Sequence, residues 1–182
     1  MKQLAADGMT FTHAFVASPS CAPSRAALLT GLMPARNGAE ANHSRPRADI
    51  RKLPAYLQAL GYEVAGFGKV AHYNQDPEYG FDHYDKRHTR EVVAEYLEQR
   101  DSGKPLCLFV GAHAPHVPWS TNAVYEPGEV TLPPTHVDTP ETRLFRTFYY
   151  TDVSKGDQLL GEVRELAREH LGENVFFIYS SD

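Results

Sequence analysis

Hydrophobic residues follow two different spacings in alternating segments of this chain. Three segments repeat core-type side chains every three or four positions, which is the spacing of one helix face. They contain Ile50, Leu53, Leu57 and Leu60; Val92, Val93, Tyr96 and Leu97; and Leu159, Val163, Leu166 and His170. Short apolar runs lie at 62–68 (YEVAGFG), 106–111 (LCLFVG) and 174–179 (NVFFIY). Such runs are typical of buried strands in a parallel sheet, so the alternation predicts an α/β domain.

A further helix is indicated near residue 25. Ser18, Ser20 and Pro23 favour a turn that enters a helix, because proline is tolerated in the first helical turn. The run RAALLTGL at 25–32 then forms the helix body, and Gly31 is placed to end it. The stretches 71–85 (AHYNQDPEYGFDHYD) and 119–140 show neither spacing. We expect the second to be a long loop of the domain, a type of segment that often carries function.

The composition narrows the class of protein. A chain of 182 residues, 42% hydrophobic and 23% charged, fits one soluble globular domain. A formal net charge of -5 with scattered basic residues argues against a nucleic-acid partner. The apolar runs are too short to span a membrane, and the start MKQLAADGMTF lacks the apolar core of a signal peptide. Two cysteines, Cys21 and Cys107, support neither a disulfide framework nor a cysteine zinc site, and Cys107 is expected to be a buried strand thiol.

Polar and ionisable residues follow each predicted strand. Lys69 and His72 come after AGFG, His113 and His116 come after LFVGA, and Asp182 comes after FFIYSS. In open α/β sheets the ligand crevice lies beyond the carboxyl ends of the strands. These strands would therefore deliver a cation, imidazoles and a carboxylate to one place. Taken singly, each has a structural alternative: a solvated lysine, loop histidines with ordinary hydrogen bonds, and an unremarkable chain end.

Cys21 is expected at or just before the start of the helix near residue 25. Unpaired backbone N–H groups and the positive end of the helix dipole favour an anion there. With Arg25 one turn further on, this setting would lower the pKa of a thiol or hold an oxyanion such as sulfate or phosphate. The alternative is a small buried residue at a helix start.

Four segments of the sequence resemble the type I sulfatases, in the order in which that family has them. CAPSRAALLTG resembles the family's Cys-x-Pro-Ser-Arg signature, and LAADGMTFTHAFVASPSC resembles the approach to it. GFGKVAHY is similar to the Gly-Lys-x-x-His segment, and HAPHVPW to the His-x-Pro-His-x-Pro loop. The stretch 148–182 resembles the long helix and the strand that lead to a metal-binding Asp. The resemblance covers nearly the whole chain.

The resemblance implies an alkaline-phosphatase-like αβα sandwich with a mostly parallel sheet, and hydrolysis of sulfate esters. Residues 1–182 would be part of the N-terminal catalytic domain. The family's signature cysteine is oxidised to formylglycine by the formylglycine-generating enzyme, and Cys21 is the matching position. One hydroxyl of the hydrated aldehyde attacks sulfur and the other later expels sulfate, which is covalent catalysis. A divalent cation, Ca²⁺ or alternatively Mg²⁺, would be held by the modified Cys21 and Asp182.

The resemblance also implies roles for the remaining residues. Arg25 would brace the formylglycine, and Lys69 would bind a sulfate oxygen. His72 would hold or deprotonate the geminal diol, and His116 would contact the sulfate and protonate the leaving oxygen. His113 would at most contact substrate. The loops suggest sulfated sugars as substrates, including those of the heparan N-sulfatase group.

The chain departs from the family pattern at both ends. The first strand with its two metal-binding aspartates, and the His or Asn and the lysine that follow the last Asp, are not in the sequence. We therefore expect an internal fragment with little activity by itself, from a protein of the periplasm, secretory pathway or lysosome. Two alternatives stay open: a phosphodiesterase or phosphonate monoester hydrolase of the same superfamily, and a non-catalytic remnant that binds an anion.

Overall fold

A three-stranded parallel sheet lies at the centre of the computed structural model, which describes residues 1–182 except for the side chain of Tyr73. The strands are β1 (Glu63–Gly68), β2 (His83–Asp85) and β3 (Leu106–Gly111), in the order β2-β1-β3. β1 and β3 pair along their full lengths, from Glu63 opposite Leu106 to Gly68 opposite Gly111. Both strands therefore end at the same edge of the sheet.

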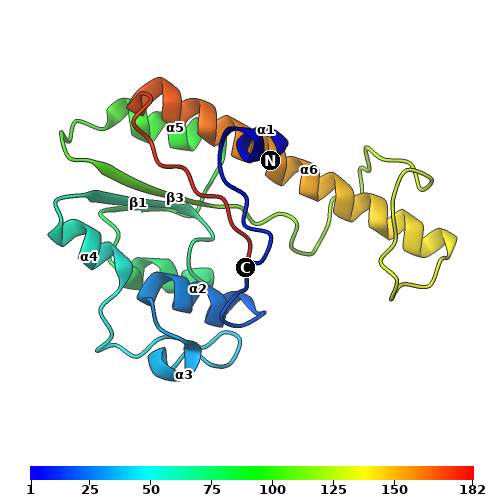
Figure 1. Ribbon diagram of the computed structural model, residues 1–182, viewed down its shortest axis with the longest axis horizontal. Helices are drawn as coiled ribbons and strands as arrows, with labels where there is room; N and C mark the ends of the chain where they lie inside the picture. Colours follow the sequence, from blue (N-terminus) through cyan, green and yellow to red (C-terminus); the bar gives the residue numbers. More distant parts are fainter.

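Helices cover the two faces of the sheet (Figure 1). They are α1 (Lys2–Asp7), α2 (Cys21–Thr30), α3 (Pro34–Asn37), α4 (Leu53–Ala59), the 3₁₀ helix η1 (Tyr73–Tyr79), α5 (Arg90–Gln99) and α6 (Pro140–Leu171). α5 and α6 lie on one face, and α2 and α4 lie on the other. This arrangement confirms the predicted α/β class with a parallel sheet.

The core has one part on each face of the sheet. On the first, Ala65 and Phe67 of β1 pack with Val93 and Leu97 of α5 and with Leu166 of α6. On the second, Leu29 of α2 packs with Val70, Ala71 and Tyr79, which follow β1. Apolar burial on both faces explains why β1 reads as an almost continuous apolar run. It also fixes the segment after β1, where the predicted polar residues begin.

Most predicted elements are confirmed, with shifted ends. The three helical patterns correspond to α4, α5 and the second half of α6, and the run after Pro23 is α2, which ends at Gly31 in the left-handed conformation. β1 and β3 occupy the first two predicted strands, and 119–139 holds no helix or strand among the described residues. Cys107 lies on β3 half-buried, and burial raises the pKa of its thiol.

The third predicted strand is wrong. Residues 174–179 form no strand, and Phe176 and Ile178 are 91% and 74% exposed. An apolar run becomes a strand only where a neighbouring strand satisfies its backbone groups. Residues 174–179 have no such partner, because β3 is an edge strand of the described sheet and pairs only with β1. Conversely, the short strand β2 and the helix η1 lie within 71–85, where no spacing predicted them. Within the described chain, no helix combines the length and the apolarity that crossing a membrane needs.

Candidate active site

Two glycines bring the ends of β1 and β3 together at the sheet edge. Gly68 has a φ of 71°, and a Cβ there would lie 2.3 Å from the carbonyl oxygen of Gly111. A Cβ on Gly111 would lie 2.1 Å from the carbonyl oxygen of Lys69. The N–H of Lys69 donates to the Gly111 carbonyl at 2.8 Å. The close approach of the two backbones therefore requires glycine at both positions, and it sets where Lys69 leaves the sheet.

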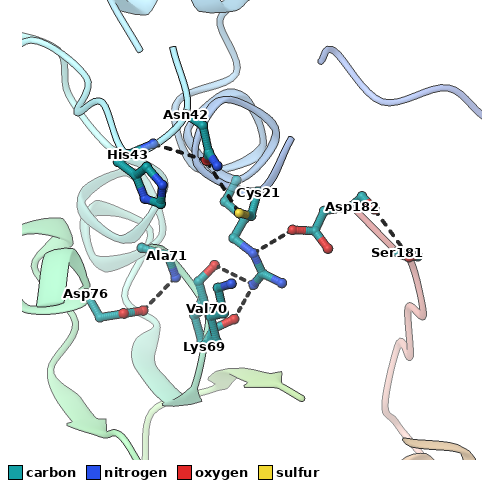
Figure 2. A network of polar contacts seen from close by, with 10 residues as sticks. Cys21, Asn42, His43, Lys69, Val70, Ala71, Asp76, Ser181 and Asp182 are labelled. Carbon is teal, nitrogen blue, oxygen red and sulfur yellow. Dashed lines mark hydrogen bonds and ion pairs between the residues drawn. The ribbon is translucent and has the colours of Figure 1, made fainter. Parts of the chain in front are cut away.

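The turn that follows β1 is held from two sides (Figure 2). Nη1 of Arg25 donates to the carbonyl oxygen of Lys69 and, at 3.1 Å, to that of Val70. From the other side, Oδ1 of Asp76 accepts from the N–H of Ala71 at 2.6 Å. Asp76 is fully buried, and burial raises the pKa of its carboxyl. The backbone that carries Lys69 and His72 is thus fixed by one side chain from α2 and one from η1.

Cys21 is the first residue of α2, as predicted. Ser20 precedes it with an extended backbone and makes no side-chain capping bond, so that side chain does not satisfy the first N–H groups of the helix. The Cys21 Sγ is 3.5 Å from Oδ1 of Asn42, which comes from the loop after α3 (Figure 2). Arg25 lies one turn along the same helix. The helix therefore places the thiol and the guanidinium at the same site.

Asp182 reaches this site from the end of the chain. Its Oδ2 accepts from Nε of Arg25 at 2.8 Å, and the two side chains are 31% and 16% exposed. The extended segment that precedes Asp182 runs back along the molecule towards α2 (Figure 1). The carboxylate is thus brought to the predicted place although residues 174–179 do not form the strand that was expected to carry it.

His72 is buried next to an unpredicted histidine. Only 2% of His72 is exposed, and its Nε2 lies 2.7 Å from Nδ1 of His43. Burial, followed by the charges of Lys69, His43 and Arg25, lowers the pKa of His72 from 6.5 to about 4, while Asp182 acts in the opposite direction. His72 is therefore a neutral ring at neutral pH.

His113 and His116 face each other in the loop after β3. Their ring centroids are 4.9 Å apart, and the N–H of His116 donates to the carbonyl of His113 at 2.9 Å. The peptide bonds before Pro115 and Pro118 are cis. Partial desolvation and the charges of His116, Lys69, His88 and Arg25 lower the pKa of His113. His113 therefore lies within electrostatic reach of Lys69 and Arg25, whereas the contacts of His116 are with His113 and its own loop.

The structure thus gathers Cys21, Arg25, Lys69, His72 and Asp182 around the end of β1. Their roles stay predictions. Sequence analysis missed three neighbours, namely Asn42, His43 and Asp76. Asn42 and His43 lie in a loop with neither hydrophobic spacing, and Asp76 lies in the irregular stretch 71–85. The Asn37-Gly38 turn signal was the one sequence cue that the chain folds back before this loop.

The described residues do not by themselves form a cation site. Among them, no group of three or more His, Cys, Asp or Glu side chains could hold a metal ion. Of the two residues that the family pattern assigns to the metal, Asp182 is engaged by Arg25 at 2.8 Å. Two ligands also fall short of the six to eight oxygens that Ca²⁺ takes.

Comparisons with known proteins identify the family of this chain. The Sulfatase family matches residues 1–182. The ulvan-active sulfatase of Formosa agariphila is 31% identical, over 98% of this chain and 38% of its own length. Human N-sulphoglucosamine sulphohydrolase is 27% identical, over 98% of this chain and 44% of its own length. The chain therefore spans less than half of each of these two relatives.

Solved structures show the same fold. BT33494S-sulf, from work on glycosaminoglycan metabolism by Bacteroides thetaiotaomicron, superposes with a TM-score of 0.72 at 20% identity, over 87% of this chain and 48% of its own. BT4656, solved with D-glucosamine-2-N,6-O-disulfate, superposes with a TM-score of 0.55 at 27% identity, over 65% of this chain and 30% of its own. Because the Sulfatase family matches this chain over residues 1–182, the chain belongs to the sulfatase family.

Proposed function

We propose that residues 1–182 form the nucleophile-bearing part of the catalytic domain of a sulfuric ester hydrolase acting on sulfated sugars. The observation that carries the proposal is the polar network in which Arg25 joins the helix of Cys21 to the backbone at Lys69 and to Asp182. Family membership supports sulfate esters as the substrate class. The activity belongs to the complete protein, since the chain spans less than half of its relatives.

Sulfated sugars are favoured by the relatives' own substrates. One relative is an N-acetylglucosamine-6-O-sulfatase of Bacteroides thetaiotaomicron, 28% identical over 65% of this chain and 26% of its own length. BT4656 is described with its substrate D-glucosamine-2-N,6-O-disulfate. We infer a sulfated carbohydrate as the substrate of this protein too.

Position 21 carries the nucleophile in this proposal. Formylglycine there, made from Cys21 by the formylglycine-generating enzyme, supplies the hydroxyl of its hydrate for attack on sulfur. The Cys21 side chain at the start of α2 is half-buried, so it is partly accessible from solvent. Helix N–H groups at this position favour the sulfate anion. Arg25 holds the adjoining backbone, and Lys69, the first residue after β1, binds a sulfate oxygen and offsets the negative charge that develops there.

Protons are handled by the histidines. His72, neutral because its pKa is lowered to about 4, takes a proton from the attacking hydroxyl. His116, in the exposed loop after β3, donates a proton to the leaving oxygen, and the neighbouring His113 contacts the sugar. A divalent cation, Ca²⁺ or Mg²⁺, belongs to the family's chemistry, but this chain's residues supply at most two of its ligands.

Turnover of matched esters tests the proposal. The complete protein, produced together with the formylglycine-generating enzyme, is assayed on an aryl sulfate, on N- and 6-O-sulfated glucosamine, and on an aryl phosphodiester. We expect release of sulfate, abolished in Cys21→Ala and retained in Cys107→Ala, which removes the cysteine of β3. Faster hydrolysis of the phosphodiester would assign the protein to the phosphodiesterase branch of the superfamily. No turnover of any ester would identify a non-catalytic relative.

A further inference from the structure

The loop after α3 contributes two adjacent side chains to the site. Asn42 points at the Cys21 thiol, with Oδ1 3.5 Å from Sγ, and the next residue, His43, contacts the His72 ring through the 2.7 Å Nδ1–Nε2 approach (Figure 2 shows Asn42, His43 and Cys21). The loop therefore touches both the nucleophile position and the histidine proposed to take its proton. Neither residue has a role in the function proposed above.

This loop is fastened at several points. At its start, the fully buried Asn37 donates to the carbonyl of Leu32 at 3.0 Å and accepts from the N–H of Ala39 at 2.7 Å. In its middle, Nε2 of Gln75 reaches the carbonyl of His43 at 3.5 Å and that of Ser44 at 3.3 Å. These contacts tie the loop to α3 on one side and to η1 on the other, so its path is defined by packed elements.

The backbone at His43 is held in an uncommon conformation. Its φ is 66°, and it is the one non-glycine residue with positive φ among the described residues. Such a conformation is disfavoured for most side chains, although Asn, Asp and His adopt it more readily than others. Residues that surrounding contacts keep in such a conformation are often found at functional sites.

The contact between the two rings limits their protonation. A 2.7 Å approach of two imidazole nitrogens is a hydrogen bond only if one nitrogen carries the proton and the other a lone pair. The pair therefore holds one proton between Nδ1 of His43 and Nε2 of His72. His72 is 2% exposed and His43 is exposed, so this contact joins a buried ring to one at the surface. A histidine's second nitrogen is set by the hydrogen bond that the first one makes.

We propose that His43 is a positioning residue that accepts the Nε2–H of His72 and so fixes the tautomer in which Nδ1 of His72 carries the lone pair. The inference rests on the proposed function, in which His72 takes a proton from the hydroxyl at position 21. Since Nε2 faces His43, that proton goes to Nδ1, which accepts it only in this tautomer. Asn42, one residue away, contacts position 21 of the same site.

Two variants distinguish the effect of the His43 ring from the effect of its backbone conformation. His43→Gly removes the ring, and His43→Asn keeps a polar group near the position of Nδ1, while both residues tolerate a positive φ. We expect His43→Gly to lower kcat of the complete protein by about 10- to 100-fold with little change in KM, the range seen when an outer partner that orients a histidine is removed. His43→Asn should recover most of the loss. His136→Ala, at an exposed histidine of the loop before α6, should leave kcat unchanged.

Nitrogen NMR of the His72 ring gives a readout that needs no substrate. We expect the Nε2–H tautomer alone in the native protein and a mixture of tautomers in His43→Gly. An Nδ1–H tautomer in the native protein, or an unchanged tautomer and kcat in His43→Gly, overturns this inference while leaving the proposed function intact. Absence of any sulfatase turnover in the native protein overturns the proposed function, and with it the catalytic role of the pair, whatever the tautomer.

Discussion

Nε of Arg25 donates to Oδ2 of Asp182 at 2.8 Å although 157 positions separate the two residues in the chain. The same guanidinium donates to the carbonyls of Lys69 and Val70. One side chain thereby connects the helix of the predicted nucleophile, the turn after β1 and the carboxylate predicted to bind metal. Guanidinium suits this position because it is planar and carries five donors in a fixed geometry.

Replacement of Arg25 by Lys tests that connection. A lysine keeps the charge but cannot reach Asp182 and two carbonyls with the same geometry. We expect Arg25→Lys to lower the free energy of unfolding of the complete protein by about 1–3 kcal/mol, because part-buried carbonyls lose their donor. Denaturant unfolding measures it. In a double-mutant cycle of Arg25→Ala with Asp182→Asn, a coupling of about 0.5–3 kcal/mol is expected, and simple additivity would show that the ion pair contributes nothing.

The close approach of β1 and β3 makes Gly111 sensitive to substitution. In Gly111→Ala the new methyl group would overlap the Lys69 carbonyl oxygen, 2.1 Å away, and the backbone that carries Lys69 would have to move. We expect a loss of about 2 kcal/mol or more in unfolding free energy, together with lower activity. Gly161 in α6 is the matched control, because a Cβ there meets nothing within 4 Å. Gly161→Ala should stabilise the protein by about 0.5–1 kcal/mol, and similar effects at both positions would contradict the account.

Elements that depend on neighbouring residues were predictable from the sequence, whereas elements that depend on a distant partner were not. α2 was predictable because its start and stop depend on nearby Ser20, Pro23 and Gly31. β1 and β3 were predictable because both are short apolar runs in a sheet with helices on its two faces. The run 174–179 is apolar too, yet Phe176 and Ile178 lie exposed, because strand formation depends on a partner strand that composition does not report.

The residues of the candidate site also differ in whether the sequence could place them. Lys69 and His113 were placed correctly because both follow strands that end at one edge. Asn42 and His43 were not, since their approach to Cys21 and His72 depends on the path of an irregular loop held by Asn37. Asp76 acts through a backbone N–H, a contact that leaves no pattern in the sequence.

Asn37 should control the order of that loop. It is fully buried, and its side-chain amide forms three hydrogen bonds. The amide NH₂ donates to Thr30 Oγ1 at 3.2 Å and to the Leu32 carbonyl at 3.0 Å, and the amide oxygen accepts from the Ala39 N–H at 2.7 Å. Asn37→Ala removes the side-chain partner of the Leu32 carbonyl and of the Ala39 N–H, and one of the partners of Thr30 Oγ1, at a loss of about 1–3 kcal/mol. We expect faster hydrogen exchange at 39–46 and lower kcat. Unchanged hydrogen exchange at 39–46 would show that Asn37 does not control the order of this loop.

His72 should make stability depend on pH. Its pKa is lowered in the folded protein from 6.5 to about 4, so between these pH values the unfolded chain binds a proton that the folded chain does not. The free energy of unfolding is therefore fully retained above pH 6.5 and falls as the pH decreases towards 4, by up to about 3 kcal/mol at roughly 1.4 kcal/mol per pH unit. His72→Gln should remove this part of the slope, whereas His136→Gln should keep it. Equal slopes in all three proteins would refute the burial of a neutral ring.

The covalent state of residue 21 shows whether Cys21 is the precursor of the nucleophile. The complete protein is produced together with the formylglycine-generating enzyme and digested with trypsin. The peptides spanning residues 3–25, which contains Cys21, and 101–143, which contains Cys107, are analysed by mass spectrometry. The account predicts an aldehyde in place of the thiol at Cys21, trapped by a hydrazide reagent, and an unmodified thiol at Cys107. An unmodified thiol at both positions would contradict the assignment of Cys21 as the precursor of the nucleophile.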